Sequence, residues 1–349
     1  MRQLARRHTA GAAAVNEVPA RRVVAVTLGD PAGVGPEIAL KAAADPRVKE
    51  RCRIVLFGDR RALDVHAQRC GMSIDCRTLS SVSEIAGCSD ELAIVHVDSL
   101  GEGLELGVVA ARYGAATVAA LDAAVQAAMD GHVDAVVGAP IHEVAIKEAG
   151  IAFDGHPSYL ARRTNTPIDE VVLMLCWDTM RIAHVTVHLS TRDAIDMITR
   201  ERVQKVIRST ARALRRLGYA RPRIGVSGVN PHAGESGLFG TEEIERIVPA
   251  IEACRGEDIE LIGPIGADTL LPRGDCDAFI VMLHDQGHVP AKLMARHGAA
   301  ALSIGTPVLF SSVGHGTAMD IAGQNKASPE AMVQALMQVT HMHSRGAIQ

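Results

Sequence analysis

The stretch "VVAVTLGDPAGVGPE", residues 23–37, begins as an apolar run and ends as the start of a helix. The apolar residues predict a buried strand, and the glycines and prolines after it predict a tight turn. Pro36 suits the first position of a helix, and Glu37 suits the positively polarised amino end. The turn has neither the G-x-G-x-x-G pattern of a dinucleotide fold nor the G-K-[ST] ending of a P-loop. The stretch therefore predicts a strand–turn–helix unit, with order beginning near Arg22.

The same alternation of strands and helices continues along the rest of the chain. It predicts an α/β fold with a largely parallel sheet. Further strands are expected at residues 52–59, 92–99, 133–140, 181–189, 223–232 and 277–285, and helices at 110–131, 192–218 and 329–343.

The composition argues against several classes of protein. The 349 residues are 48% hydrophobic and 3% aromatic, and the formal net charge is −4. Without a strong positive charge, nucleic acid and anionic membranes are not expected as partners, and no apolar run approaches the roughly 20 residues that span a bilayer. The seven cysteines form no C-x-x-C pair and are odd in number, which predicts reduced thiols in a cytoplasmic protein. Residues 1–21 carry several arginines and one acid and are expected to form a disordered tail.

Three histidines share one local setting, because each comes just after an apolar run that predicts a strand. They are His188, His232 and His284. Ligands bind at the carboxyl ends of strands in open α/β sheets, and three neutral imidazoles meeting there would suit a divalent metal with an open position for substrate. Asp285 and Asp268 are candidates to orient the imidazole rings. A histidine at a strand end is also a common structural residue, so this pattern alone leaves both roles open.

Two glycine-containing segments could hold an anion or a nucleotide. Residues 230–243, "NPHAGESGLFGTEE", end in a helix start, and a helix amino end beside a flexible loop can bind an anion. Residues 314–323, "GHGTAMDIAG", contain Asp320. An aspartate near adenosine accepts hydrogen bonds from ribose hydroxyls and repels a 2′-phosphate, which favours NAD over NADP. The alternative is that Asp320 only caps the following turn.

Several of these motifs are familiar as a set. The segment "HGTAMDIAG" resembles the adenosine-binding loop of isocitrate and isopropylmalate dehydrogenases. The segments "VTLGDPAGVGPEI", "VNPHAGESGLFGTEE", "GPIGADTL" and "MLHDQGHVPAK" together resemble the 4-hydroxythreonine-4-phosphate dehydrogenase family, from about Val23 to about Ala335. The resemblance implies an isocitrate/isopropylmalate-dehydrogenase-like fold with two α/β lobes and an active-site cleft between them. It implies a homodimer with the active site near the interface. It also implies oxidation of a secondary alcohol with NAD, followed by loss of carbon dioxide from a β-keto acid.

The resemblance implies roles for particular residues and segments. A divalent metal, most often zinc, would be held by His188, His232 and His284. The first lobe, with the adenosine-binding loop, would comprise residues 22–135 with about 300–349. The second lobe, with the metal histidines and the dimer contacts, would comprise about 136–299. The expected catalytic residues are His188, His232, His284, Lys292 and Asp285. The expected substrate-binding residues are His156, Lys292 and Phe310. The expected cofactor-binding residues are His315, Gly316, Thr317, Ala318 and Asp320.

At four positions the chain departs from the vitamin B6 enzyme of that family. Pro157 replaces a threonine, Glu143 a lysine, Ala301 an asparagine and Phe310 an arginine. The lost asparagine and arginine bind substrate there, whereas Lys292 is retained. Replacing arginine by phenylalanine removes a bidentate donor, and burying a phosphate dianion without such donors is costly. A phosphorylated substrate is therefore not expected.

Another branch of the family agrees better with these positions. The segments "HEVAIKEAGIAFDGHPSYLA", "VTVHLS" and "SSVGHGTAMDIAG" resemble the terephthalate cis-dihydrodiol dehydrogenases. That branch oxidises a dihydroxycyclohexadiene dicarboxylate with NAD and releases carbon dioxide to give protocatechuate, and the resemblance implies this reaction here. The alternatives are a dehydrogenase of 4-phosphohydroxy-L-threonine or of a 4-phosphoerythronate-type acid, and a non-catalytic ligand-binding homologue. Retention of the three histidines and Lys292 argues against the last alternative.

Overall fold

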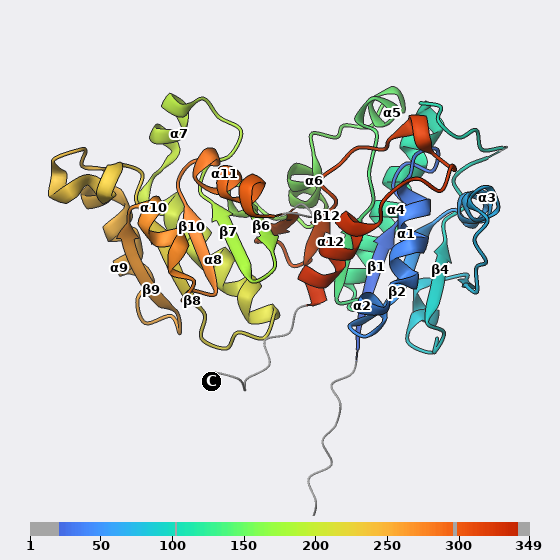
Figure 1. Cartoon of the computed structure of the whole chain (residues 1–349), viewed down its shortest axis with the longest axis horizontal. Coiled ribbons are helices and arrows are strands. Elements are labelled where there is room, and N and C mark those ends of the chain that lie inside the picture. Colours follow the sequence, from blue (N-terminus) through green and yellow to red (C-terminus); the bar gives the residue numbers. More distant parts are fainter. Residues whose placement is uncertain (1–20, 102, 296–298, 341–349) are drawn as a thin grey trace, which may run out of the picture.

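A computed structural model describes residues 21–101, 103–295 and 299–340 of the chain. The strands in these residues form one sheet of 12 strands. Figure 1 shows this sheet extending through the molecule, with helices packed along it. In order across the sheet, the strands are β3 (Arg77–Leu79), β4 (Leu92–His96), β2 (Cys52–Gly58), β1 (Arg22–Thr27), β5 (Ala135–Gly138), β12 (Phe310–Ser312), β11 (Ala300–Ile304), β6 (Val172–Trp177), β7 (Met180–His184), β10 (Ala278–Val281), β8 (Arg223–Ser227) and β9 (Glu260–Ile265).

Helices join most of these strands, so the α/β alternation that the sequence predicts is confirmed. Aliphatic side chains fill the layer between helices and sheet, and Val24, Leu56 and Leu63 have no exposed surface there. The helices are α1 (Gly35–Ala44), α2 (Pro46–Lys49), α3 (Arg60–Cys70), α4 (Ala111–Met129), α5 (Glu143–Glu148), α6 (His156–Arg163), α7 (Thr191–Met197), α8 (Arg200–Arg216), α9 (Val248–Cys254), α10 (Ala267–Leu270), α11 (His284–Met294) and α12 (Glu330–Thr340).

The first part of the chain forms one end of the sheet, at the right of Figure 1. There β1 pairs in parallel with β2 on one side and with β5 on the other. The chain runs from β1 outward to β2, β3 and β4 and then returns to β5 on the opposite side of β1. Connections therefore leave β1 and β5 in opposite directions, which creates a switch point between their carboxyl ends.

The opposite end of the sheet has a second switch point. There β10 lies between β7 and β8 and pairs with both in parallel, with Phe279 opposite Ile182 and Ala278 opposite Ile224. The chain runs from β8 outward to β9 and returns to β10 on the other side of β8. The carboxyl ends of β7, β10 and β8 therefore lie side by side at one edge of the sheet.

The middle of the sheet differs from the largely parallel arrangement that the sequence predicts. Strand β6 pairs antiparallel with β7 and with β11, and β11 pairs antiparallel with β12. Strand β12 then pairs in parallel with β5, so the two ends belong to one hydrogen-bonded sheet. The division into two lobes with a cleft between them stays a prediction.

Two further expectations can be compared with the structure. The helix expected at 192–218 is broken into α7 and α8, because the Thr199 hydroxyl accepts the Arg202 N–H at 3.1 Å and begins a new helix. The predicted tail of residues 1–21 lies outside the described residues except for Arg21, which pairs with Glu91 at 2.7 Å. Within the described residues, no helix is both long and apolar enough to cross a membrane.

Candidate active site

The three strand-end histidines follow three neighbouring strands. His188 comes after β7, His284 after β10 and His232 after β8, so all three lie at the second switch point. The rings of His188 and His284 lie with their centroids 5.9 Å apart. A cavity of about 480 Å³ is lined by both of these rings, together with Ser190 and Asp285. The structure thus brings two of the three predicted metal ligands to one cavity.

Asp285 lies where the sequence predicts an orienting carboxylate. Its Oδ1 is 2.7 Å from Nδ1 of His284. A carboxylate only accepts hydrogen bonds, so Nδ1 donates and Nε2 of His284 is left as a free donor atom for a metal. The His288 ring stacks on the His284 ring at 3.7 Å and further restricts its rotation.

His232 lies on a separate turn, Pro231–Gly237, with left-handed backbone angles at five successive residues from His232 to Ser236. Its side chain is 68% exposed, and Nδ1 lies 3.4 Å from Oε2 of Glu235. Across the described residues, no three His, Cys, Asp or Glu side chains lie close enough together to hold a metal. The donor atoms of His188 and His284 fit a divalent metal, and His232 would have to leave Glu235 to join them.

A buried carboxylate anchors the turn that carries His232. Glu243 is almost fully buried, and its Oε1 accepts the backbone N–H groups of Val229 at 2.7 Å and Asn230 at 2.8 Å. Its Oε2 accepts the Asn230 side-chain amide at 2.9 Å. Sequence reasoning assigned Glu243 only to a helix start and missed this role. The signal was an acid following a glycine-rich turn, which by itself does not distinguish an anchor from a cap.

The predicted substrate residue His156 lies at the first end of the sheet, at the start of α6. Its ring centroid is 5.0 Å from that of Phe310 and 5.6 Å from that of Phe153, and its Nε2 is buried without a hydrogen-bond partner in the described structure. Burial lowers the pKa of His156 to about 4, so the ring is neutral at pH 7. Phe310 has no exposed surface and lies against His156. Phe310 thus affects this site by packing against the His156 ring.

The predicted cation Lys292 lies on α11, at the other end of the sheet. It is exposed, and within the described residues it makes no ion pair. A second substrate carboxylate would need another cation. Arg162 and Arg163 are already paired with Asp154 at 2.7 Å and with Asp122 at 3.2 Å. A third arginine that could serve, Arg296, lies outside the described residues.

The predicted cofactor loop, residues 314–323, follows the carboxyl end of β12. The carbonyl of Thr317 accepts the Val34 N–H at 2.9 Å, which docks the loop on the turn between β1 and α1. Ala318 has a left-handed backbone, whereas His315 and Gly316 are exposed. The Asp320 carbonyl accepts the Gln324 amide at 2.7 Å, so the carbonyl, and not the exposed carboxylate, closes the following turn. The carboxylate remains available to a ligand.

The turn between β1 and α1 is not a phosphate loop. Its backbone N–H groups are used within the protein: Ala32 donates to Oδ1 of Asp30 at 2.9 Å, Gly33 to the Asp30 carbonyl at 3.1 Å and Val34 to Thr317. Phosphate loops need free N–H groups that point at the anion. The absence of a P-loop pattern in the sequence agrees with this geometry.

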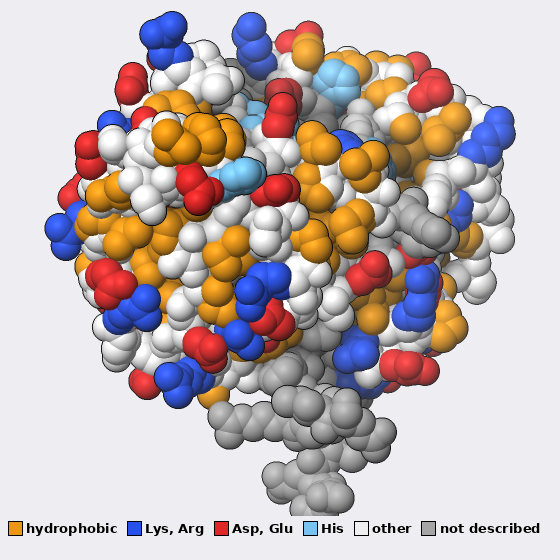
Figure 2. Space-filling model, turned by 60° about the vertical axis from the view of Figure 1, so that its left-hand side comes forward, with side chains coloured by type: hydrophobic (Ala, Val, Ile, Leu, Met, Phe, Trp, Pro, Cys, Tyr) orange, Lys and Arg blue, Asp and Glu red, His pale blue; other side chains and the backbone are white. Residues whose placement is uncertain are grey.

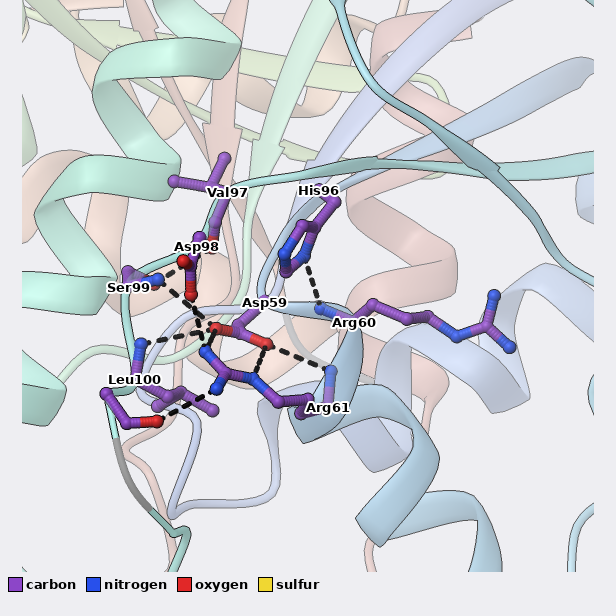
Figure 3. Close-up of polar contacts among 9 residues, drawn as sticks. Asp59, Arg60, Arg61, His96, Val97, Asp98, Ser99 and Leu100 are labelled. Atoms are coloured by element: carbon purple, nitrogen blue, oxygen red, sulfur yellow. Dashed lines mark hydrogen bonds and ion pairs between the residues drawn. The ribbon is translucent and has the colours of Figure 1, made fainter.

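A charged network supports the neighbouring edge of the sheet, where β2 and β4 end. Figure 3 shows Asp59 accepting hydrogen bonds from Arg61 at 2.6 Å and from the backbone of Ser99 and Leu100 at 3.2 Å each. Burial raises the pKa of Asp59, but these hydrogen bonds outweigh burial and hold it well below its usual range. Because its carboxylate accepts these hydrogen bonds, Asp59 fixes the start of the loop after β4. Its role is therefore to hold this part of the fold.

Known proteins with similar sequences are dehydrogenases. The 1,2-dihydroxy-3,5-cyclohexadiene-1,4-dicarboxylate dehydrogenase of Comamonas sp is 41% identical over 315 residues, covering 90% of this chain and 96% of that protein. The D-threonate 4-phosphate dehydrogenase of Cupriavidus necator is 39% identical over 329 residues, covering 93% and 98%. The crystal structure of a 4-hydroxythreonine-4-phosphate dehydrogenase from Burkholderia phymatum superposes with a TM-score of 0.86 at 36% identity, covering 92% and 98%. The fold and these relatives define an oxidoreductase.

The family is defined by a match to most of the chain. The family described as "Pyridoxal phosphate biosynthetic protein PdxA" matches residues 50–339, and the chain belongs to it. The resemblance to 4-hydroxythreonine-4-phosphate dehydrogenases and to the dihydrodiol branch is therefore confirmed.

Proposed function

We propose that this chain is an NAD- and metal-dependent dehydrogenase that oxidises a cis-dihydrodiol dicarboxylate and releases carbon dioxide. The observation that supports this best is the contact of His156 with fully buried Phe310. A neutral imidazole backed by an aromatic ring supplies no charge to a phosphate dianion, whose burial would be costly. The same surroundings suit a six-membered carbocycle, and the Comamonas relative carries the name of such an enzyme.

The reaction balances as an oxidation followed by a decarboxylation. The diol would lose a hydride from one carbinol carbon to NAD and release the hydroxyl proton. The new ketone would lie beta to a ring carboxylate. The bond from the ring to that carboxylate would then break, and its electron pair would form an enolate that takes up a proton at oxygen. Recovery of aromaticity would favour this step. The products would be protocatechuate, carbon dioxide and NADH.

Most of the predicted residues have a direct role in this scheme. The Lys292 ammonium would pair with a ring carboxylate, and Nε2 of His156 would form a hydrogen bond with a hydroxyl or the other carboxylate. Asp320 and the loop before it would hold the adenosine. His188, His284 and His232 would hold a divalent metal, most often zinc in this family, which would stabilise the developing negative charge on the substrate oxygen. Because these groups come from both ends of the sheet, the substrate would bind between two lobes.

A homodimer agrees with an exposed apolar surface beside this site. We define the α11 face as Val289, Leu293 and Met294 of α11 with Leu271 and Pro272. These residues line a groove of about 580 Å³ that Asp285 also borders. Leu293 is 79% exposed, and Figure 2 shows hydrophobic side chains gathered in patches on this side of the molecule. Large exposed apolar surfaces mark interaction sites, so we assign the α11 face to the contact with a second copy.

A second candidate is oxidation of a phosphorylated hydroxy acid. The Cupriavidus relative has a name of that kind and is nearly as similar. Lys292, which is free of ion pairs within the described residues, could bind a phosphate as a point charge. This candidate requires a second cation that the described surroundings of His156 do not supply.

Substrate oxidation distinguishes the two candidates. Metal-loaded protein would be offered NAD with the terephthalate dihydrodiol, with 4-phosphohydroxy-L-threonine, or with D-threonate 4-phosphate, and NADH formation followed by absorbance. We expect turnover of the diol and at least about a hundredfold lower kcat/KM for both phosphates, since an unpaired buried dianion costs several kcal/mol. Preference for either phosphate would show that our interpretation of Phe310 is wrong. Turnover of none, with no binding of NAD, would favour a non-catalytic homologue.

A further inference from the structure

The first switch point contains two ionisable side chains that the proposed scheme does not use. Asp30 follows β1 and His142 follows β5, and the turns that carry them touch. The Asp30 N–H donates to the Pro140 carbonyl at 2.9 Å. A Cβ on Gly29 would lie 2.2 Å from the same carbonyl oxygen, so only glycine allows the two turns to approach this closely. Switch points of this kind are where open α/β sheets bind ligands.

The unpaired atoms of Asp30 and His142 are complementary. Asp30 has 0% exposed surface, and its Oδ2 is buried without a partner in the described structure. His142 is half-buried, and its Nδ1 is likewise buried without a partner. Burial raises the pKa of Asp30 to about 6, while the hydrogen bond from Ala32 and the charge of His142 act to lower it. The two atoms are not hydrogen-bonded to each other in the described structure, but the turns that carry them are joined by the bond from Asp30 to Pro140.

The platform under this pair is rigid. Gly114 of α4 meets the backbone of Ala145 in α5 so closely that a Cβ would lie 2.2 Å away. The Thr117 hydroxyl of α4 lies 3.3 Å from the Gly29 carbonyl. One helix therefore holds both the β1 turn and the start of α5, where His142 lies without making a helix cap.

The predicted cofactor loop begins after β12 and docks on the turn that carries Asp30. Strand β5 lies between β1 and β12, and the loop runs from β12 to the β1–α1 turn, where Thr317 accepts the Val34 N–H. His156 also lies near the end of β5, because a Cβ on Gly138 would lie 3.5 Å from its Nε2. Asp30 and His142 thus lie between the residues predicted to bind adenosine and a residue predicted to bind substrate.

The chemistry of this place favours a neutral, hydroxyl-bearing group over a phosphate. The N–H groups of residues 32–34 are all used within the protein, so none is free for an anion. A buried carboxylate would repel a diphosphate, whereas it strengthens an imidazole as a partner for a hydroxyl group. Of the parts of NAD between adenosine and the reacting carbon, only the nicotinamide-side ribose meets this description.

We propose that Asp30 and His142, whose facing turns leave one buried atom of each unpaired, close into a carboxylate–imidazole pair when NAD binds, and that the second ring nitrogen of His142 binds a hydroxyl group of the nicotinamide-side ribose. His142 contacts the ligand, and Asp30 is a positioning residue that holds the ring through Nδ1. The proposal rests on the use of NAD in the proposed function. It adds a binding contact that depends on neither the metal nor the identity of the substrate.

Binding of NADH to the full chain, followed by its fluorescence, tests the pair without any turnover. The variants are Asp30→Asn, His142→Ala and the double variant. We expect each to weaken NADH binding about tenfold, the value of one lost hydrogen bond of about 1.4 kcal/mol. The NADH affinity of the double variant is expected to lie within about twofold of that of His142→Ala, because both changes remove the same contact.

Thermal unfolding at pH 8 separates positioning from a structural role. Asn keeps the Oδ1 acceptor for Ala32 but removes a buried charge, so Asp30→Asn is expected to unfold at the same or a higher temperature than the wild type. Asp134→Asn is the matched control. Asp134 accepts the Val23 N–H at 2.8 Å at the opposite ends of the same two strands, so its replacement is expected to lower the unfolding temperature and leave NADH binding unchanged.

The outcomes distinguish this proposal from the proposed function. A wild type that binds NADH, with both single variants within about twofold of it, would overturn the pair alone. A joint loss of stability and of NADH binding in Asp30→Asn, with full binding in His142→Ala, would make Asp30 structural and also overturn it. A wild type that binds no NADH would refute the cofactor and the pair together.

Discussion

His156 shows how one side chain can serve a site and weaken the fold. Burial lowers its pKa from 6.5 to about 4, so the unfolded chain binds a proton that the folded chain does not between these pH values. Stability must therefore fall as pH falls from about 6.5 towards 4. His184, whose pKa burial lowers to about 3, acts in the same direction.

Replacement of His156 is expected to reduce this pH dependence. The unfolding temperature of metal-free His156→Asn should fall less than that of the wild type between pH 8 and pH 5, by about 2–4 °C, which corresponds to about 2 kcal/mol in a chain of this size. Thermal unfolding at the two pH values measures this difference. Equal pH dependence in both proteins would mean that the ring is solvated in the folded state. Phe153→Leu, which keeps the histidine beside a changed neighbour, is the control and should retain the pH dependence.

At the scale of residues, sequence predicts groups that share a local pattern and misses those that meet only in space. His284 and Asp285 are adjacent in the sequence and follow a strand, so their contact could be expected. Asp30 and His142 come from two distant turns, and nothing near either of them in the sequence indicates that the turns touch. Their pairing requires knowing that β1 and β5 are neighbours.

The turn after β8 is the element on which the proposed metal site depends. Glu243 holds this turn by accepting the backbone N–H groups of Val229 and Asn230. The backbone from His232 to Ser236 is left-handed, a conformation that residues other than glycine adopt at a cost in free energy. Such a turn persists only when surrounding contacts fix it. Loss of the Glu243 contacts should therefore release His232.

The metal affinity of Glu243→Gln tests this dependence. Gln keeps the shape but weakens the charge-assisted hydrogen bonds, so we expect zinc affinity, measured by calorimetry, to fall about 10–100-fold, as when other outer partners of a metal site are lost. His232→Ala should lose measurable metal binding and turnover. Glu242→Gln, which alters the neighbouring acid that accepts the Asn230 side-chain amide, is the control. Full affinity in Glu243→Gln would show that the turn holds its shape without the carboxylate.

Elements were predictable where apolar runs were bounded by turn residues, and less so elsewhere. The strand expected at 181–189 ends at His184, although the backbone N–H groups of Val185 and Thr186 still donate to the carbonyls of Val281 and Met282. The helix at 192–218 is broken because Thr199 offers a side-chain cap within an otherwise helical pattern. Strand β12 has only three residues and could not be recognised by periodicity.

For the whole molecule, the α11 face gives the clearest test of assembly. Leu293→Asp would place a charge in an apolar contact, so we expect it to shift the protein from dimer to monomer at micromolar concentration, with a cost of at least about 2 kcal/mol in association. Light scattering coupled to gel filtration measures the mass. Ile168→Asp is the control, because Ile168 is also well exposed but lies on another surface. A dimer that survives Leu293→Asp would place the contact elsewhere. A wild type that is monomeric would refute the proposed dimer.

Strand order is the property of the whole molecule that the sequence did not reveal. The pattern predicted α/β units, but it could not show that β11 and β12 would join the two ends into one sheet. That joint depends on pairing between Phe310 and Val136 and between Leu302 and Met174, residues far apart in the chain.

The position of β12 has a consequence for the synthesis of this protein. A ribosome makes β1 to β5 early, yet β5 has no partner on its outer side until residues 310–312 have been made. Helix α12, which packs on α1 and α2, arrives later still. The nascent chain thus carries an apolar strand edge through most of its translation, the kind of surface on which newly made chains aggregate or are bound by chaperones. The end of the molecule that is begun first is the last to be completed.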